Sequence, residues 1–84
     1  MLLAIDVGNT NTVLGIFEGE ALINSWRVKT DQRDTADELW IRYTSLLQNY
    51  QVDALAICST VPATLRELRT MVESHFANTP VMIV

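Results

Sequence analysis

The sequence predicts an α/β fold whose elements follow the order β-β-β-α-β-α-β. Residues 2–30 form three largely apolar segments separated by short polar turns, and residues 36–84 alternate segments of helical spacing with short apolar runs. Short turns join antiparallel strands, whereas helical crossovers join parallel strands. Together the two observations predict a mixed sheet packed against helices.

The first three strands are expected at Leu2–Asp6, Thr12–Glu18 and Ala21–Thr30. The composition of the second segment, Thr-Val-Leu-Gly-Ile-Phe-Glu, is typical of a strand. Gly19 lies in the middle of the Glu-Gly-Glu turn that follows it. Because both connections are short, we expect the three strands to form an antiparallel meander.

A change to helical periodicity marks the first helix. Thr35 and Glu38 have the spacing of a capping box, in which each side chain bonds the backbone amide of the other. Asp37 and Glu38 also suit the positive end of the helix dipole. Apolar positions at i, i+3, i+4 and i+7, continued to i+14, predict about four turns. These positions are Ala36, Leu39, Trp40, Tyr43, Leu46, Leu47 and Tyr50.

The chain then predicts a strand and a second helix. Ala54–Ser59 is a short, nearly continuous apolar run, which is typical of a strand covered on both faces. Pro62 is expected to open the helix, because proline is tolerated in a first turn. Ser59 and Thr60 are expected to cap it. Its predicted apolar face contains Leu65, Leu68, Val72 and Phe76.

A last strand, Val81–Val84, follows an Asn-Thr-Pro break. A hairpin meander followed by two β-α units is the pattern of the ribonuclease-H-like fold, with the first strand central and the parallel strands on one side of it. The sequence stops inside this apolar strand without a turn or cap, so we expect the fold to be incomplete at its C-terminal end. Residues 1–84 are therefore expected to be one lobe of a larger protein, or a chain that associates to cover that edge.

Composition excludes several classes of function. The chain has 84 residues, of which 49% are hydrophobic and 19% charged, as in globular proteins. Its formal net charge of −4 argues against binding to nucleic acid or to anionic lipid. A single cysteine excludes an internal disulfide, and no Cys/His pattern indicates zinc. No apolar run is long enough for a signal peptide or a membrane span, so we expect a soluble cytoplasmic protein.

The stretch AIDVGNTNTVLGIFEG, residues 4–19, carries the functional prediction. Asp6 ends a strand and places a carboxylate at the rim of the sheet, and Gly8 permits a positive φ or close approach of a ligand. Asn9–Thr12 add side-chain donors to backbone amides, a combination that suits phosphate oxygens. Asp6 would repel phosphate unless a Mg²⁺ bridged the two. The motif therefore predicts a metal–phosphate clamp, while an ordinary hairpin turn is the alternative, since Asn side chains bond their own backbone in turns.

Other noticeable side chains have simpler expected roles. Cys58 is expected to be a small buried hydrophobe rather than a nucleophile. His75, the single histidine, has no partner at ligand spacing and is expected at a surface or interface. Three aromatic side chains are expected to pack inside: Trp26, Trp40 and Tyr43. Three cations are expected to be solvated, with a role near a nucleotide or substrate left open: Arg27, Lys29 and Arg33.

The segment Asp6-Val7-Gly8-Asn9-Thr10 between two hairpin strands resembles the first phosphate motif of the superfamily of acetate kinases, sugar kinases and actin. Within that superfamily, the chain is similar to the N-terminal lobe of type III pantothenate kinases. Four segments carry this narrower resemblance in the family's order, and they are IDVGNTNTVLGIF, WRVKTD, RDTADEL and ICSTVP. The resemblance covers essentially the whole chain.

The resemblance implies an actin-like ATPase fold of two lobes and an enzyme that phosphorylates pantothenate to phosphopantothenate with ATP, the first committed step toward coenzyme A. It also implies Mg²⁺ with the nucleotide, a monovalent cation (K⁺ or NH₄⁺) and a homodimer. Asp6 would lie near the metal. The residues that match the motif holding the ATP phosphates are Asp6, Val7, Gly8, Asn9, Thr10, Asn11, Thr12 and Val13.

In the family that it resembles, the catalytic aspartate belongs to a Gly-x-Asp-Arg segment beyond the position of Val84. The monovalent-cation ligand and most of the pantothenate pocket also follow later. We therefore expect no catalytic residue in this chain, and no kinase activity from residues 1–84 alone. Two alternatives stay open: a non-catalytic relative that acts as a nucleotide-binding regulatory or accessory protein, and a generic domain in which Gly-Asn-Thr is only a turn.

Overall fold

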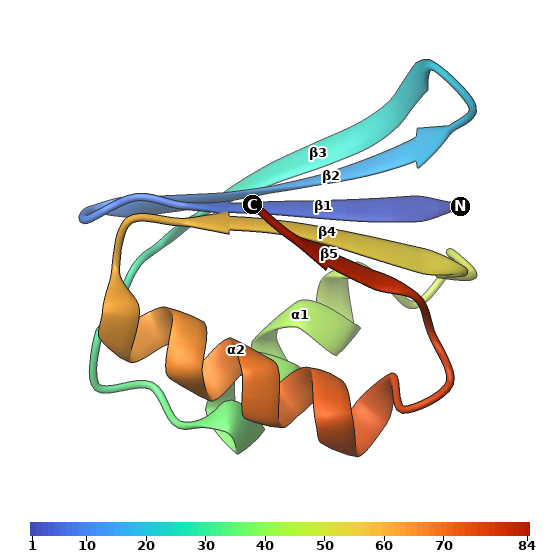
Figure 1. The fold of residues 1–84 in the computed structure, drawn as a ribbon. Helices are drawn as coiled ribbons and strands as arrows, with labels where there is room; N and C mark the ends of the chain where they lie inside the picture. The colour runs from blue at the N-terminus through green and yellow to red at the C-terminus, as the bar shows by residue number, and fades with distance from the viewer.

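The computed structural model describes residues 1–84 and contains the seven elements in the predicted order. They are β1 (Leu2–Val7), β2 (Asn11–Glu18), β3 (Ala21–Lys29), α1 (Ala36–Leu46), β4 (Ala54–Ser59), α2 (Pro62–His75) and β5 (Val81–Ile83). The strands form one sheet in the order β3-β2-β1-β4-β5 (Figure 1). The meander is antiparallel, and β4 pairs parallel with both β1 and β5. The predicted mixed sheet with its first strand in the centre is confirmed.

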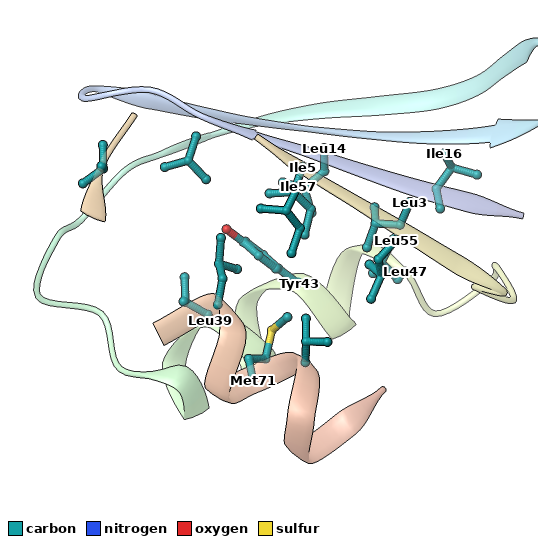
Figure 2. Packing of buried hydrophobic residues seen from close by; sticks show 14 residues of the cluster. Leu3, Ile5, Leu14, Ile16, Leu39, Tyr43, Leu47, Leu55, Ile57 and Met71 are labelled. Carbon is teal, nitrogen blue, oxygen red and sulfur yellow. The ribbon is translucent and has the colours of Figure 1, made fainter. Parts of the chain in front are cut away.

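Both helices cover the same face of the sheet, and the hydrophobic core lies between them and the strands (Figures 1 and 2). Alternate residues of the central strands point into this layer, so that Ile5 lies beside Leu14 of β2 and Ile57 of β4. Tyr43 of α1 and Met71 of α2 meet them from the helical side and are 2% and 1% exposed. Because β1 and β4 are parallel neighbours in this packed layer, both strands end at the same side of the sheet.

The second face of the sheet has no helix over it, which overturns two predictions. Leu55 and Ile57 are buried beneath the helices, but Cys58 is exposed on the opposite face. The expectation that β4 is covered on both faces is therefore wrong, as is the expectation of a buried Cys58. Successive residues of a strand alternate between faces, so an apolar run with one covered face exposes every second side chain.

The first helix begins as predicted and ends early. Thr35 and Glu38 form the expected capping box. The helix has 11 residues, about three turns, and Tyr50 lies beyond its end. Tyr50 packs instead against Trp26 of β3, with ring centroids 5.7 Å apart, and its hydroxyl accepts a hydrogen bond from Asn24 Nδ2 at 3.1 Å. Tyr50 thus has the spacing of the helix but packs against the sheet. The predicted four turns are therefore wrong.

The second helix begins at Pro62 as predicted, and its buried face includes two residues outside the predicted set, Thr64 and Met71. At its C-terminal end, the exposed ring of His75 stacks on Trp40 of α1 with centroids 4.0 Å apart. The predicted surface position of His75 is confirmed, whereas Trp40 is only half-buried. Neither helix is long and apolar enough to cross a membrane.

Candidate functional site

The candidate site lies at the edge of the sheet where the parallel strands β1 and β4 end. The turn of Gly8–Thr10 joins β1 to β2 at this edge, and α2 begins at the same edge (Figure 1). In open sheets that contain parallel strands, ligands bind outside the carboxyl ends of those strands. The residues of the predicted clamp therefore stand where the fold offers a ligand site.

Asp6, near the end of β1, is exposed on the uncovered face of the sheet. Its neighbours in the sheet register are Val13 of β2 and Cys58 of β4. The structure contains three ion pairs, and Asp6 takes part in none of them. Its carboxylate is thus available to a ligand or a metal ion.

Gly8 opens the turn and is tightly placed. Its amide donates to the carbonyl of Asn11 at 2.9 Å, which closes the hairpin. A Cβ on Gly8 would lie 3.2 Å from that carbonyl oxygen. The φ of Gly8 is not positive, and only Gly19, in the β2–β3 turn, has a positive φ, of 60°. The positive φ predicted for Gly8 is therefore wrong, whereas the close approach of a ligand stays a prediction. The tight contact that the structure shows is with Asn11 at the start of β2.

The polar residues of the motif divide into an exposed and a buried group. Asn9, Thr10 and Asn11 are exposed, and Asn11 Nδ2 donates to Thr10 Oγ1 at 3.2 Å. Thr12 is 2% exposed, and its Oγ1 lies 2.8 Å from Oγ1 of Thr30. The expectation that the Thr12 side chain faces phosphate is wrong, because the alternation along β2 turns it toward the helices. The two remaining motif residues are Val7, which is buried, and Val13, which is half-buried.

A hollow of about 670 Å³ opens beside the turn, between it and the β3–α1 connection. Its wall includes Asn9 and three cations, Lys29, Arg33 and Arg42. The structure therefore brings two of the three predicted solvated cations next to the motif and leaves out Arg27. Sequence reasoning missed Arg42. Its only signal in the sequence is a positive charge within the predicted first helix, which follows the third strand.

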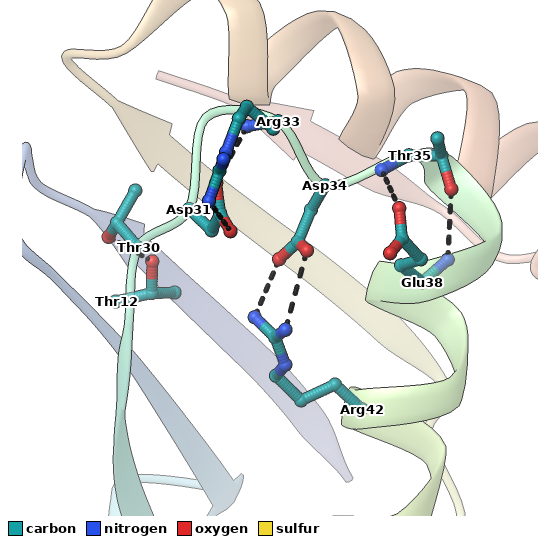
Figure 3. A network of polar contacts seen from close by, with 8 residues as sticks. All are labelled: Thr12, Thr30, Asp31, Arg33, Asp34, Thr35, Glu38 and Arg42. Atoms are coloured by element: carbon teal, nitrogen blue, oxygen red, sulfur yellow. Dashed lines mark hydrogen bonds and ion pairs between the residues drawn. The ribbon is translucent and has the colours of Figure 1, made fainter.

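Charge pairing organises the β3–α1 connection (Figure 3). Arg42 Nη1 and Nη2 donate to the two carboxylate oxygens of Asp34 at 2.6 and 3.3 Å, and the Asp34 side chain is 6% exposed. Arg33 donates to Asp31, and this hydrogen bond lowers the pKa of Asp31. The connection is thus tied to α1, so the wall of the hollow is a built structure rather than a loose loop.

The start of α2 differs from the predicted one. The N-cap residue is Val61, and it makes no side-chain capping bond. Ser59 Oγ instead accepts from the amide of Val61 at 3.0 Å, and the Thr60 amide donates to the carbonyl of Val7 at 3.1 Å. The predicted cap by Ser59 and Thr60 is therefore wrong, because the Ser59 hydroxyl bonds Val61 itself and Thr60 bonds Val7 at the end of β1. No acidic residue occupies the first turn of α2, which leaves the positive end of its dipole uncompensated.

The side chains at this edge fit a nucleotide-bound Mg²⁺ better than a metal held by protein alone. No group of three or more His, Cys, Asp or Glu side chains is placed to hold a metal ion. Mg²⁺ in phosphate sites is commonly bound by one or two carboxylates, with phosphates and water completing its shell. A single exposed Asp6 beside polar turn residues agrees with that arrangement.

Comparison with known proteins places this chain in a family. The family model for type III pantothenate kinase matches residues 2–84. The chain is 64% identical over 84 residues to a type III pantothenate kinase from Frankia casuarinae and 60% identical to one from Frankia alni. A type III pantothenate kinase from Salinispora arenicola is 51% identical over 86 residues. In each case the match spans the whole chain and 34% of the relative, so the chain spans about a third of the length of these curated proteins.

Two solved structures share the fold at low identity. RuvC from Thermus thermophilus has a TM-score of 0.64 at 24% identity, with 98% of this chain and 59% of RuvC covered. A Ppx/GppA family member from Aquifex aeolicus has a TM-score of 0.52 at 14% identity, with 99% of this chain and 34% of that protein covered. The likeness confirms the predicted ribonuclease-H-like fold.

Proposed function

Because this chain belongs to the type III pantothenate kinase family, we propose that it supplies the ATP-phosphate-binding lobe of an enzyme that phosphorylates pantothenate to phosphopantothenate. The observation that supports this proposal is the exposed, unpaired carboxylate of Asp6 beside the Gly8–Thr10 turn, in which Asn9 and Thr10 are exposed. A carboxylate beside neutral donors at a strand end suits a Mg²⁺ ion bound to phosphate oxygens.

In this proposal each residue of the edge has a limited task. Asp6 would hold Mg²⁺, and the bound ion would neutralise charge on the phosphates. Asn9 and Thr10 orient phosphate oxygens with their side chains and amides, and the uncapped start of α2 adds a favourable dipole. These are the positioning and electrostatic effects that dominate phosphoryl transfer.

The remaining parts of the activity are proposed for the longer protein. Residues 1–84 form the N-terminal lobe, and a second lobe supplies the catalytic aspartate, most of the pantothenate pocket and the site for K⁺ or NH₄⁺. The longer protein acts in the cytoplasm as a homodimer, in the first committed step toward coenzyme A. The chain by itself has no kinase activity, because it holds only the phosphate-binding half of the site.

Calorimetric titration with Mg-ATP and with Mg-free ATP tests the role of Asp6. Asp6→Asn is expected to weaken Mg-ATP binding at least about tenfold, because the neutral isosteric amide binds Mg²⁺ much more weakly than a carboxylate does. The same variant should bind Mg-free ATP as well as the wild type or better, since a negative charge facing the phosphates is gone. Glu73→Gln, an equal change of charge on the exposed surface of α2, is the control. If Asp6→Asn weakens the binding of Mg-ATP and of Mg-free ATP equally, Asp6 has a structural role and the assignment is overturned.

An assay of pantothenate-dependent ATP turnover tests the division of labour. The 84-residue chain is expected to show none, and measurable turnover that disappears in Asp6→Asn would contradict the proposal. A longer protein that contains the missing aspartate and binds Mg-ATP without turning it over would favour the alternative, a nucleotide-binding accessory protein. If the wild type does not bind Mg-ATP, the remaining alternative is a generic domain in which Gly-Asn-Thr is only a turn.

A further inference from the structure

The hydrogen bonds between β2 and β3 continue past the end of the strand pairing. The last register pair joins Asn11 of β2 to Lys29 of β3. Beyond it, the amide of Thr30 donates to the carbonyl of Thr10 at 3.0 Å, and the hydroxyls of Thr12 and Thr30 bond each other at 2.8 Å (Figure 3). Thr30 therefore holds the β2 side of the Gly8–Thr10 turn in two ways: its backbone amide bonds Thr10, and its hydroxyl bonds Thr12 in β2.

The β1 side of the turn is held by a separate contact with Thr60. The amide of Thr60 donates to the carbonyl of Val7 at 3.1 Å, where β1 leaves the sheet. Apart from these contacts, the turn has its own closing bond from Gly8 to Asn11 and the bond from Asn11 Nδ2 to Thr10 Oγ1. Loss of the Thr30 contacts would leave the tip of the hairpin attached at one side, and exposed hairpin tips open readily when few bonds restrain them.

Thr30 is itself held in place. It follows β3 directly and precedes the connection whose Asp34 is bound by Arg42 of α1. The Asp34 carboxylate is almost fully buried, so this ion pair is a fixed point rather than a mobile surface contact. The side chain of Thr12 is likewise buried, and its hydroxyl is bonded to that of Thr30. The turn is thus connected to the helical layer through Thr30.

We propose that Thr30 is a positioning residue for phosphate binding, which holds the Gly8–Thr10 turn in the conformation that receives the ATP phosphates. This inference rests on the proposed function and adds to it a residue outside the motif. Thr30 touches the turn and need not touch the nucleotide. Pre-organised donors bind phosphate more tightly than mobile ones, because their ordering has already occurred in the free protein.

Thr30→Val and Thr30→Ser separate the hydroxyl from the shape of the side chain. Valine keeps the branched shape but leaves the buried Thr12 hydroxyl without this partner, whereas serine keeps the bond. Two readouts are needed: amide hydrogen exchange by NMR in the ligand-free chain, and calorimetric titration with Mg-ATP. Thr70→Val is the control, because the Thr70 hydroxyl bonds only the carbonyl of Arg66 within α2.

In Thr30→Val, exchange at the amides of Gly8 and Thr30 is expected to become about tenfold faster, and Mg-ATP binding about tenfold weaker. Thr30→Ser should stay within about threefold of the wild type in both measurements. Thr70→Val should change neither. The local pattern distinguishes positioning from general destabilisation, which would accelerate exchange throughout the central strands.

Three results would contradict the positioning role of Thr30 or the proposed function. If the wild type binds Mg-ATP and Thr30→Val binds it equally well, the positioning role is wrong and the proposed function stands. If Thr30→Ser loses as much affinity as Thr30→Val, the hydroxyl bond is not the cause, and the inference is overturned. If the wild type does not bind Mg-ATP, the proposed function is wrong, and a phosphate-positioning role for Thr30 falls with it.

Discussion

Glu67 of α2 accepts a hydrogen bond from the backbone amide of Ala36, the first residue of α1, with Oε1 and N 3.0 Å apart. The capping box satisfies two neighbouring amides, since Thr35 Oγ1 accepts from Glu38 and Glu38 Oε1 accepts from Thr35. The start of α1 is therefore capped by its own residues and by a carboxylate of the other helix. This contact fixes the two helices to each other beside the β3–α1 connection.

Glu67→Ala is expected to lower the free energy of unfolding by about 1 to 2 kcal/mol, because it removes a charged hydrogen-bond partner from a helix amino terminus. Urea unfolding followed by circular dichroism measures the change. Glu73→Ala, an exposed position on the same helix, is the control and should change stability by less than about 0.5 kcal/mol. Equal effects of the two substitutions would contradict a specific role for the Glu67 cap.

Arg42→Met is expected to destabilise the fold by about 1 to 3 kcal/mol, because it leaves the buried carboxylate of Asp34 without its partner. Methionine retains the apolar stem, which isolates the loss of the charge. Adding Asp34→Asn should restore part of the stability, since the unpaired charge is then removed. A double-mutant cycle measures this coupling, and strictly additive effects would show that the pair does not stabilise the connection.

Gly8→Ala and Gly15→Ala place a new Cβ equally close to another atom, 3.2 Å in each case. At Gly8 the atom is the backbone carbonyl oxygen of Asn11, whereas at Gly15 it belongs to the ring of Phe17 on the uncovered face. A side chain can rotate away, but the carbonyl is fixed by the turn. We expect Gly8→Ala to weaken Mg-ATP binding about tenfold or more. Gly15→Ala should leave that affinity nearly unchanged, and the reverse order would contradict the assigned turn geometry.

Local patterns were readable from the sequence, and long-range ones were not. The capping box was predictable because Thr35 and Glu38 are three residues apart and face each other by helical geometry alone. The bond between Thr12 and Thr30 joins residues 18 apart, and that between Ala36 and Glu67 joins residues 31 apart. Nothing in the periodicity of either segment indicates these partners.

The mistaken predictions for Tyr50 and Cys58 have a common physical origin. An apolar residue was assigned to the nearest periodic element, although burial depends on which neighbours the fold supplies. Tyr50 continued the spacing of α1 but packs on β3, and Cys58 continued the run of β4 but faces the open side of the sheet. Asp6 and Gly8 could be placed at a strand end and a turn because these are local features of the sequence. Its wall was missed because Arg42 arrives from a separate element.

Alkaline pH is expected to destabilise the fold through Tyr43. Burial raises the pKa of Tyr43 to about 12, against an ordinary value near 10. The unfolded chain therefore loses this proton at a lower pH than the folded chain. The stabilisation is fully present below about pH 10 and is lost as the pH rises toward about 12, by about 2 to 3 kcal/mol.

Urea unfolding at increasing pH measures this loss, with Tyr43→Phe as the matched variant. Phenylalanine keeps the buried ring and has no proton to release, so its stability should fall less steeply above about pH 10. Parallel pH profiles for the two proteins would show that another group governs the alkaline transition.

Thr64→Val is expected to leave stability unchanged or to raise it by up to about 1 kcal/mol. Thr64 lies in the first turn of α2 and is 4% exposed, and its hydroxyl has no hydrogen-bond partner. Valine has nearly the same shape and removes the unsatisfied polar atom. Thr12→Val is the opposite case, because the Thr12 hydroxyl is bonded to Thr30, and it should destabilise by about 1 kcal/mol or more. Comparable losses from both substitutions in urea unfolding would mean that the Thr64 hydroxyl has a partner after all, such as a buried water.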